Sequence, residues 1–374
     1  MRIIESSPIL ESKTRTGKDK LWQGHVYQDG TRFFTGTSYW QVAKDGTESK
    51  RQSSEPYEAL PKNVGKGNET SAKDQAVSEF ESFVKKQMDK GYSAVGSVKV
   101  EGDPLPMLAH KFRDHGHKVV YPVYVQPKLD GMRMLFDGKR GWSRGNKAII
   151  PEVIQHLQID TGGYIFDGEL ILPGNGPLQD TMSAAKKFRP GISDKLQYWV
   201  YDIVEPNMTY KERMTVLGKI FMGPTTPWNS NNNIIWTLTS KADDEAEVLL
   251  VHKQFVADGY EGTIIRDPNG KYEIGNRSYS LLKLKDFQDE EFKIIDVIDG
   301  GGMMVEMAIF RVETKDGKIF ESTPQANHDQ RKEMFKDRKK LIGKWATIRF
   351  YGKTKDGIPM FNNSVAVRDW EDFN

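Results

Sequence analysis

The sequence predicts an α+β fold in several domains. Strand-like runs separated by tight turns fill much of the first hundred residues, and the middle of the chain alternates strands with turns. Residues 287–374 form a third region of short β runs around one basic helix. A doubly wound α/β fold would alternate strands with helices throughout, so we expect separate antiparallel sheets instead. With roughly 150 residues per domain, 374 residues have room for two or three domains.

The composition excludes several classes of protein. The 54 Lys and Arg residues nearly balance the 52 Asp and Glu residues, so the formal charge of +2 excludes a polybasic tail protein and an acidic solvating chain. Without any cysteine, the chain has no disulfide framework, no Cys-ligated metal centre and no thiol nucleophile. The first 25 residues lack the apolar segment of a secretory signal, and no apolar run could span a bilayer. We expect an intracellular protein that is not secreted and has no membrane contact.

Residues 1–100 are expected to form a small β-plus-helix domain. Residues 21–27 and 33–40 have the composition of strands, and Asp-Gly between them is a tight-turn pair. Over residues 71–90, apolar side chains recur at helical spacing, and a glycine follows where a C-terminal cap belongs. The stretch 94–107 is punctuated by Gly and Pro, which indicates a linker.

Residues 101–286 and 287–374 are expected to form the second and third domains. A helix is predicted over residues 243–258, where apolar side chains recur at helical spacing. The other segments of the second domain read as strands, at residues 123–126, 133–136, 164–172 and 196–204. In the third domain, a basic helix over 330–341 lies among strand-like runs at 292–297, 307–312, 318–321 and 345–351. This pattern predicts a small five-stranded OB barrel.

Lys128 is the first candidate for chemistry. It follows an apolar strand and precedes a glycine turn in the run Gln-Pro-Lys-Leu-Asp-Gly-Met-Arg, residues 126–133. A lysine whose pKa is lowered by burial or by neighbouring cations can act as a nucleophilic amine. A solvated turn lysine is the alternative.

Carboxylates and cations elsewhere in the second domain strengthen this interpretation. Asp167 and Glu169 alternate along one strand, so we expect both carboxylates to project together, as suits a hard cation such as Mg²⁺. A half-solvated polar strand face is the alternative. Lys283 and Lys285 share one face of a strand, where a phosphate would relieve their repulsion. Glu261 lies between two glycines, which permit close approach of the backbone to a ligand.

Tyr201 adds an aromatic ring next to an acid within an apolar run. Such a ring is suited to stacking on a nucleobase, although a tyrosine in a core strand more often packs.

The motifs KxDGxR, FDGEL, EGTIIR and KLK occur in this order, and together they resemble the covalent nucleotidyltransferase superfamily. Within it, the chain resembles the ATP-dependent DNA ligases, over residues 126–285 and less tightly through to Arg368. The resemblance implies sealing of 3′-OH/5′-phosphate nicks in duplex DNA, through lysyl-AMP and DNA-adenylate intermediates. It also implies ATP as co-substrate, Mg²⁺ or Mn²⁺ as the metal, and a part in DNA replication, repair or recombination.

The resemblance also assigns roles to residues. Lys128 corresponds to the lysine that attacks the α-phosphate of ATP, and Arg144 to a group that holds the 5′-phosphate of the nick. The nucleotide-binding residues that it implies are Gln126, Pro127, Arg133, Glu169, Tyr201, Glu261, Lys283, Lys285 and Arg368. The implied metal ligands are Asp130, Glu169 and Glu261. Near Arg368 the family's usual lysine is missing, and a surface arginine on a barrel-closing strand is the alternative there.

The first hundred residues are similar to a WGR-type DNA-end-binding module, with Tyr-Trp-Gln at 39–41 in place of the Trp-Gly-Arg triplet. Lys62 and Lys66, in the loop before the predicted helix, are the DNA-binding residues that this similarity implies. A plain β-plus-helix appendage is the alternative.

Several other functions share these motifs. An RNA ligase and an mRNA guanylyltransferase use the same lysine and carboxylates, and a nucleic-acid-binding protein with an inactive transferase fold is the non-enzymatic alternative. An NAD-dependent ligase is disfavoured because its zinc-binding cysteines are missing. The DNA ligase interpretation implies nicked duplex DNA as partner, a monomer, and a cytoplasmic, nucleoid or viral replication site.

Overall fold

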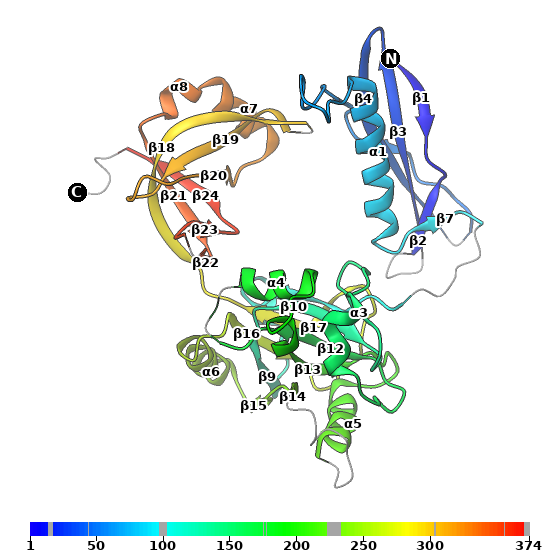
Figure 1. Ribbon diagram of the computed structural model, residues 1–374, viewed down its shortest axis with the longest axis vertical. Coiled ribbons are helices and arrows are strands. Elements are labelled where there is room, and N and C mark those ends of the chain that lie inside the picture. Colours follow the sequence, from blue (N-terminus) through cyan, green and yellow to red (C-terminus); the bar gives the residue numbers. More distant parts are fainter. Residues whose placement is uncertain are drawn as a thin grey trace. The chain divides into compact units, whose positions relative to one another are not determined.

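The computed structural model describes residues 1–13, 18–43, 45–96, 103–174, 176, 178–222, 233–302, 304–354 and 356–369. The chain divides into two compact units, Val100–Asp286 and the combination of Met1–Lys99 with Phe287–Asn374. The α+β class is confirmed by the mixture of helices and mainly antiparallel sheets (Figure 1). Among the helices within these residues, none has the length and apolar character needed to span a membrane.

The N-terminal segment is a seven-stranded sheet covered by one helix. Its long strands β3 (Asp19–Asp29) and β4 (Arg32–Val42) are joined by a turn in which Gly30 has a φ of +60°. The helix α1 (Ala72–Met88) begins after Ser71, whose side chain accepts the Asp74 N–H, and packs on β3 and β4 (Figure 1). The shorter strands are β1 (Arg2–Ser6), β2 (Leu10–Lys13), β5 (Gln52–Ser53), β6 (Tyr57–Glu58) and β7 (Ser93–Ala94).

The Val100–Asp286 unit contains two five-stranded sheets, with strand orders β11-β10-β12-β13-β14 and β15-β9-β16-β17-β8. The first sheet consists of β10 (Met132–Phe136), β11 (Gly141–Ser143), β12 (Phe166–Ile171), β13 (Gln197–Ile203) and β14 (Ile234–Trp236). The second consists of β8 (Leu108–Lys111), β9 (Val123–Lys128), β15 (Ser240–Ala242), β16 (Gly262–Arg266) and β17 (Arg277–Leu284). Each sheet buries an apolar face in a core of its own, so charged side chains can meet between the two sheets.

The helices of this unit are more numerous than the sequence pattern predicts. The predicted helix is confirmed as α6 (Glu245–Ala257). The four predicted strands are confirmed as β9, β10, β12 and β13, while α4 (Leu178–Lys186) and α5 (Tyr210–Met222) form in stretches for which no element was predicted. The core contacts of α4 are made by small residues, and α5 buries Arg213 beside Tyr210 and Leu217. The shorter helices are α2 (Phe112–His115), η1 (Gly116–Lys118), α3 (Pro151–Ile154), η2 (Gln155–Leu157) and η3 (Ser193–Lys195).

The C-terminal segment forms the predicted five-stranded barrel, closed in the order β18-β19-β20-β24-β21. Its strands are β18 (Gln288–Gly301), β19 (Met304–Glu313), β20 (Ile319–Pro324), β21 (Trp345–Phe350) and β24 (Asn363–Arg368), and β22 (Gly352–Lys353) pairs with β23 (Pro359–Met360). The predicted basic helix is divided into α7 (His328–Lys336) and α8 (Arg338–Leu341). Arg331 in α7 is buried and donates to the Ala308 carbonyl, so it is part of the barrel's packing.

Candidate active site

Both sheets of the Val100–Asp286 unit contribute to one cavity of about 460 Å³. Most residues that the sequence motifs nominate line this cavity, from strands of both sheets and from the loop after β11. These residues are Gln126, Pro127, Lys128, Arg133, Arg144, Glu169, Tyr201, Lys283 and Lys285. The fold thus brings the separate motifs into a single site.

Two glycines allow the strands around the cavity to approach closely. A Cβ atom at Gly131, in the turn after β9, would lie 2.3 Å from the backbone oxygen of Leu170. Gly262 begins β16 with a φ of +152°, and a Cβ atom there would lie 2.2 Å from the backbone oxygen of Leu284. Because any side chain would displace a neighbouring strand, these positions of the KLDG and EG motifs require glycine.

Lys128 is the last residue of β9, and its side chain is 20% exposed. Its Nζ forms an ion pair with the carboxylate of Glu261. Burial lowers the pKa of Lys128, and the positive charge of Arg133 acts in the same direction. The carboxylates of Glu169 and Asp130 oppose this shift. The buried amine therefore gives up its proton more readily than an exposed lysine does.

Glu261 pairs with Lys285 as well, so one carboxylate contacts two lysines. Burial and the charge of Lys128 lower the pKa of Lys285 to about 8. Burial and the same neighbour also lower the pKa of Lys283. A bound polyphosphate would counter the repulsion among these cations, which makes this part of the cavity suited to an anionic ligand.

Glu169 on β12 pairs in register with Arg133 on β10, and it lines the cavity. Burial raises the pKa of Glu169 to about 7. The Tyr201 hydroxyl lies 3.3 Å from Glu169 Oε2 and donates to it. A cavity that combines an aromatic ring with a carboxyl of raised pKa has the character of a functional site.

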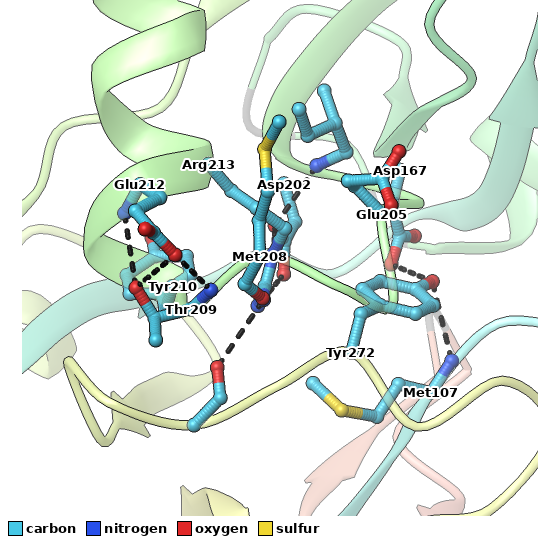
Figure 2. Close-up of polar contacts among 12 residues, drawn as sticks. Met107, Asp167, Asp202, Glu205, Met208, Thr209, Tyr210, Glu212, Arg213 and Tyr272 are labelled. Atoms are coloured by element: carbon cyan, nitrogen blue, oxygen red, sulfur yellow. Dashed lines mark hydrogen bonds and ion pairs between the residues drawn. The ribbon is translucent and has the colours of Figure 1, made fainter.

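Arg133 is held by Asp167, whose two carboxylate oxygens accept from its Nε at 2.9 Å and its Nη2 at 2.6 Å. The Tyr272 hydroxyl donates to Asp167 at 2.8 Å and accepts from the Met107 N–H at 3.2 Å (Figure 2). The side chain of Asp167 is 1% exposed. Asp167 therefore holds Arg133, and the predicted metal role of the pair Asp167 and Glu169 stays a prediction.

The other nominated residues lie outside this cavity. Asp130 is exposed in the turn after β9, and Arg368 is an exposed residue at the end of β24 in the barrel. In the N-terminal segment Lys66 is exposed, and Lys62 pairs with Glu79 at 3.2 Å. Within the described parts of the chain, no three His, Asp or Glu side chains gather as a metal-binding cluster. The roles of these residues stay predictions.

Sequence reasoning did not nominate Arg266 and Arg277, which also line the cavity. Arg266 is the last residue of the EGTIIR motif, and that position is the signal that could have identified it. Arg277 begins β17 without a motif around it, so no comparable signal marks it.

Comparisons with known proteins agree with this geometry. Residues 106–285 match the family model of the ATP dependent DNA ligase domain, and residues 301–368 match that of the DNA ligase OB-like domain. The DNA ligase of African swine fever virus (isolate Pig/Kenya/KEN-50/1950) is 28% identical, over 97% of this chain and 94% of the relative. A DNA ligase of Enterobacteria phage T6 is 24% identical, over 57% of this chain and 55% of the phage protein.

A solved structure of a Lig E DNA ligase superposes with a TM-score of 0.60 and 25% sequence identity, over 71% of this chain and 99% of the ligase. Both family models describe DNA ligase domains, and these relatives are DNA ligases. The comparisons therefore favour the DNA ligase interpretation over the RNA ligase, the guanylyltransferase and the inactive transferase fold. The chain belongs to the ATP-dependent DNA ligases, enzymes that use ATP to join DNA.

Proposed function

We propose that Lys128 is the nucleophile of this ligase and that it carries AMP between ATP and DNA. The observation that supports this most directly is the buried Lys128 amine, of lowered pKa, in a cavity lined by cations. The neutral amine attacks the α-phosphorus of ATP. A bond forms between Nζ and phosphorus, the bond from the α-phosphorus to the bridging oxygen breaks, and pyrophosphate leaves. The amine loses its proton to solvent or to a neighbouring carboxylate.

Two further steps at the same cavity complete the joining of a nicked duplex. An oxygen of the 5′-phosphate attacks the AMP phosphorus, which restores the Lys128 amine and gives a DNA-adenylate. The 3′-hydroxyl then attacks the 5′-phosphorus, a phosphodiester bond forms, and AMP leaves. Arg144 lies at the cavity lining with an exposed guanidinium, which supports a contact of its own with the 5′-phosphate.

Each lining residue has a role that its chemistry supports. Tyr201 stacks on the base, and Gln126 meets the base edge beside Pro127. Arg133, held by Asp167, contacts ribose or phosphate, and Lys283 and Lys285 bind phosphate oxygens. Arg368 of the barrel orients the departing pyrophosphate.

The carboxylates fit a divalent cation, Mg²⁺ or Mn²⁺, when phosphate oxygens complete its ligands. Mg²⁺ is commonly held by one or two carboxylates together with substrate phosphates, so a three-carboxylate cluster is not required. Glu169 is the first such ligand, because its raised pKa reflects a buried carboxyl that a cation would stabilise in the ionised form. Glu261 and the exposed Asp130 are the further candidates. A bound divalent ion would supply charge neutralisation for the phosphates.

The DNA partner is proposed to be a nicked duplex bound by one copy of the chain. The N-terminal segment, with exposed Lys62 and Lys66, adds contacts to the phosphate backbone and takes no part in the chemistry. Sedimentation of the protein with a nicked duplex should give a one-to-one complex.

The experiment that tests the proposed function combines labelling and sealing. Protein mixed with ATP labelled in the α-phosphate and a divalent cation should take up label in a bond that acid cleaves, as expected for phosphorus bound to nitrogen. The same protein should seal a nicked DNA duplex. Label taken up from GTP in preference to ATP, or label without sealing, would contradict the proposal.

A further inference from the structure

A buried chain of charged and polar side chains connects the two sheets of the Val100–Asp286 unit. Asp202 on β13 is 0% exposed and accepts hydrogen bonds from two arginines. Arg213 on α5 donates to it through Nε at 2.6 Å and Nη2 at 3.1 Å, and Arg266 on β16 donates through Nη1 at 2.7 Å. The carboxylate of one sheet thus fixes a guanidinium of the other.

Arg213 anchors this arrangement from outside the cavity. Its side chain is 1% exposed, and its Nη1 donates to the carbonyl oxygens of Met208 at 2.8 Å and Gly270 at 3.2 Å. Figure 2 shows Arg213 reaching between Asp202 and Met208. A guanidinium that satisfies a carboxylate and two carbonyls holds these three segments in one position.

Arg266, held by Asp202, in turn contacts Gln126, which lines the cavity and is 1% exposed. The Arg266 Nε donates to Gln126 Oε1 at 2.7 Å. The Gln126 Nε2 donates to Thr239 Oγ1 at 2.8 Å and lies 3.4 Å from the Tyr201 carbonyl oxygen, which also accepts from it. An amide turned the other way would place its NH₂ group against the Nε–H of Arg266, so the guanidinium fixes its orientation.

The Gln126 amide can therefore make one further hydrogen bond, and only as an acceptor through Oε1. Both N–H groups have acceptors, whereas Oε1 has a second lone pair beyond the one that Arg266 uses. A base edge that meets this amide must donate a hydrogen bond. Adenine presents an amine at C6, while a 6-oxo purine presents a carbonyl oxygen that can only accept.

We propose that Arg213 is a positioning residue for nucleotide selection, acting through Asp202 and Arg266. By fixing the Gln126 amide, this chain makes the cavity select a 6-amino purine over a 6-oxo purine. The inference rests on the proposed function, in which the nucleotide enters this cavity and reacts with Lys128.

The test compares ATP with inosine triphosphate, which carries oxygen at C6 in place of the amine. The second-order rate constant for single-turnover transfer of nucleotide to the protein is measured with each, and the ratio of the two values reports selection. Arg213→Lys keeps the charge but loses the paired donors, so the preference for ATP should fall by roughly tenfold, the effect of about one hydrogen bond. Thr239→Val frees one N–H of Gln126, so the use of inosine triphosphate should rise.

Tyr272→Phe is the matched control. It keeps the ring, whose centroid lies 5.5 Å from Cζ of Arg213, and removes only the buried hydroxyl, whose hydrogen bonds lead to Asp167 and Met107 and not to Gln126. It should change the values for both nucleotides together and leave their ratio as in the wild type. If Arg213→Lys does not fold, Arg266→Lys and Thr239→Val test the same chain.

The failure of the positioning role and the failure of the proposed function would give different results. An unchanged ratio in the folded variants would overturn the positioning role, although transfer from ATP would still support the proposed function. A wild-type protein that takes up neither nucleotide would overturn the proposed function and this inference with it.

Discussion

Glu261 and Lys128 are 133 positions apart in the sequence and form an ion pair at the cavity that Lys128 lines. The antiparallel pairing of β9 with β16 produces this contact, because Gly262 lies opposite Lys128. Burial lowers the pKa of Lys128 and favours the neutral amine that can attack phosphorus. An anion paired with Nζ, as Glu261 is, favours the charged ammonium instead. The reactivity of Lys128 therefore depends on the balance between these two influences.

The first prediction concerns this balance. Transfer from ATP should become faster with rising pH, because deprotonation creates the nucleophile, and its midpoint should lie below 10.5, the ordinary lysine pKa. Glu261→Gln removes the opposing anion, so the midpoint should move to lower pH even if the maximal rate also falls. Single-turnover labelling across pH measures both quantities. The control is Glu212→Gln, which removes an exposed carboxylate on α5 and should leave the midpoint unchanged. An unchanged or higher midpoint in Glu261→Gln would contradict the account.

The second prediction concerns stability and Glu169. Burial raises its pKa from 4.5 to about 7, so the folded protein retains a proton on this carboxyl in a pH range where the unfolded chain has lost it. Stability should therefore fall as pH rises from 4.5 to 7, by about 3 kcal/mol at most. Glu169→Gln should be more stable than the wild type at pH 8 and equal to it near pH 4. Urea unfolding at both pH values is the measurement, and a variant less stable at pH 8 would show that Glu169 supports the fold.

The third prediction concerns the support of Arg133. Asp167→Asn leaves a largely buried guanidinium without its anion and should destabilise the unit by about 3–5 kcal/mol. Tyr272→Phe removes two buried hydrogen bonds, one to Asp167 and one from the Met107 N–H, and should cost about 1–3 kcal/mol. Urea unfolding of both variants gives the comparison. Equal losses would mean that the ion pair contributes no more to stability than the two hydrogen bonds of the Tyr272 hydroxyl.

The fourth prediction concerns the N-terminal segment. Replacing Lys62 and Lys66 together by Gln should weaken binding to a nicked duplex and reduce the slope of log affinity against log salt by about 2, roughly one unit for each lost phosphate contact. Self-labelling from ATP should stay as in the wild type. Lys85 and Lys90, replaced together, give the same change of net charge at another part of the segment. If both double variants lose the same affinity, the effect is one of net charge and the loop has no contact of its own.

The helices show how far the sequence could predict the fold. Residues 243–258 are rich in apolar side chains and are followed by a glycine, and α6 forms there. In α5, Arg213 occupies a core position because its partner Asp202 lies in a neighbouring strand. Hydrophobic periodicity treats such a residue as exposed, so the burial of Arg213 could not be predicted from the local pattern.

In the site, too, residues within one contiguous motif could be predicted, whereas contacts between distant segments could not. Lys128 and Gly131 could be nominated because their motif is contiguous in the sequence. Alternation along β12 could not show that Asp167 is buried against Arg133 while Glu169 lines the cavity, since their partners come from other segments. The link from Arg213 to Gln126 also crosses two sheets, and it depends on strand pairing that a local pattern does not contain.

The most direct test of the central claim is to locate the nucleotide on the protein. Wild-type protein is incubated with ATP and a divalent cation, digested, and analysed by mass spectrometry for the lysine that carries AMP. The account predicts AMP on Lys128, no adduct in Lys128→Arg, and retention of sealing by that variant on a duplex that already carries a DNA-adenylate. AMP on Lys283 or Lys285 in the wild type, or an unchanged adduct in Lys128→Arg, would contradict it.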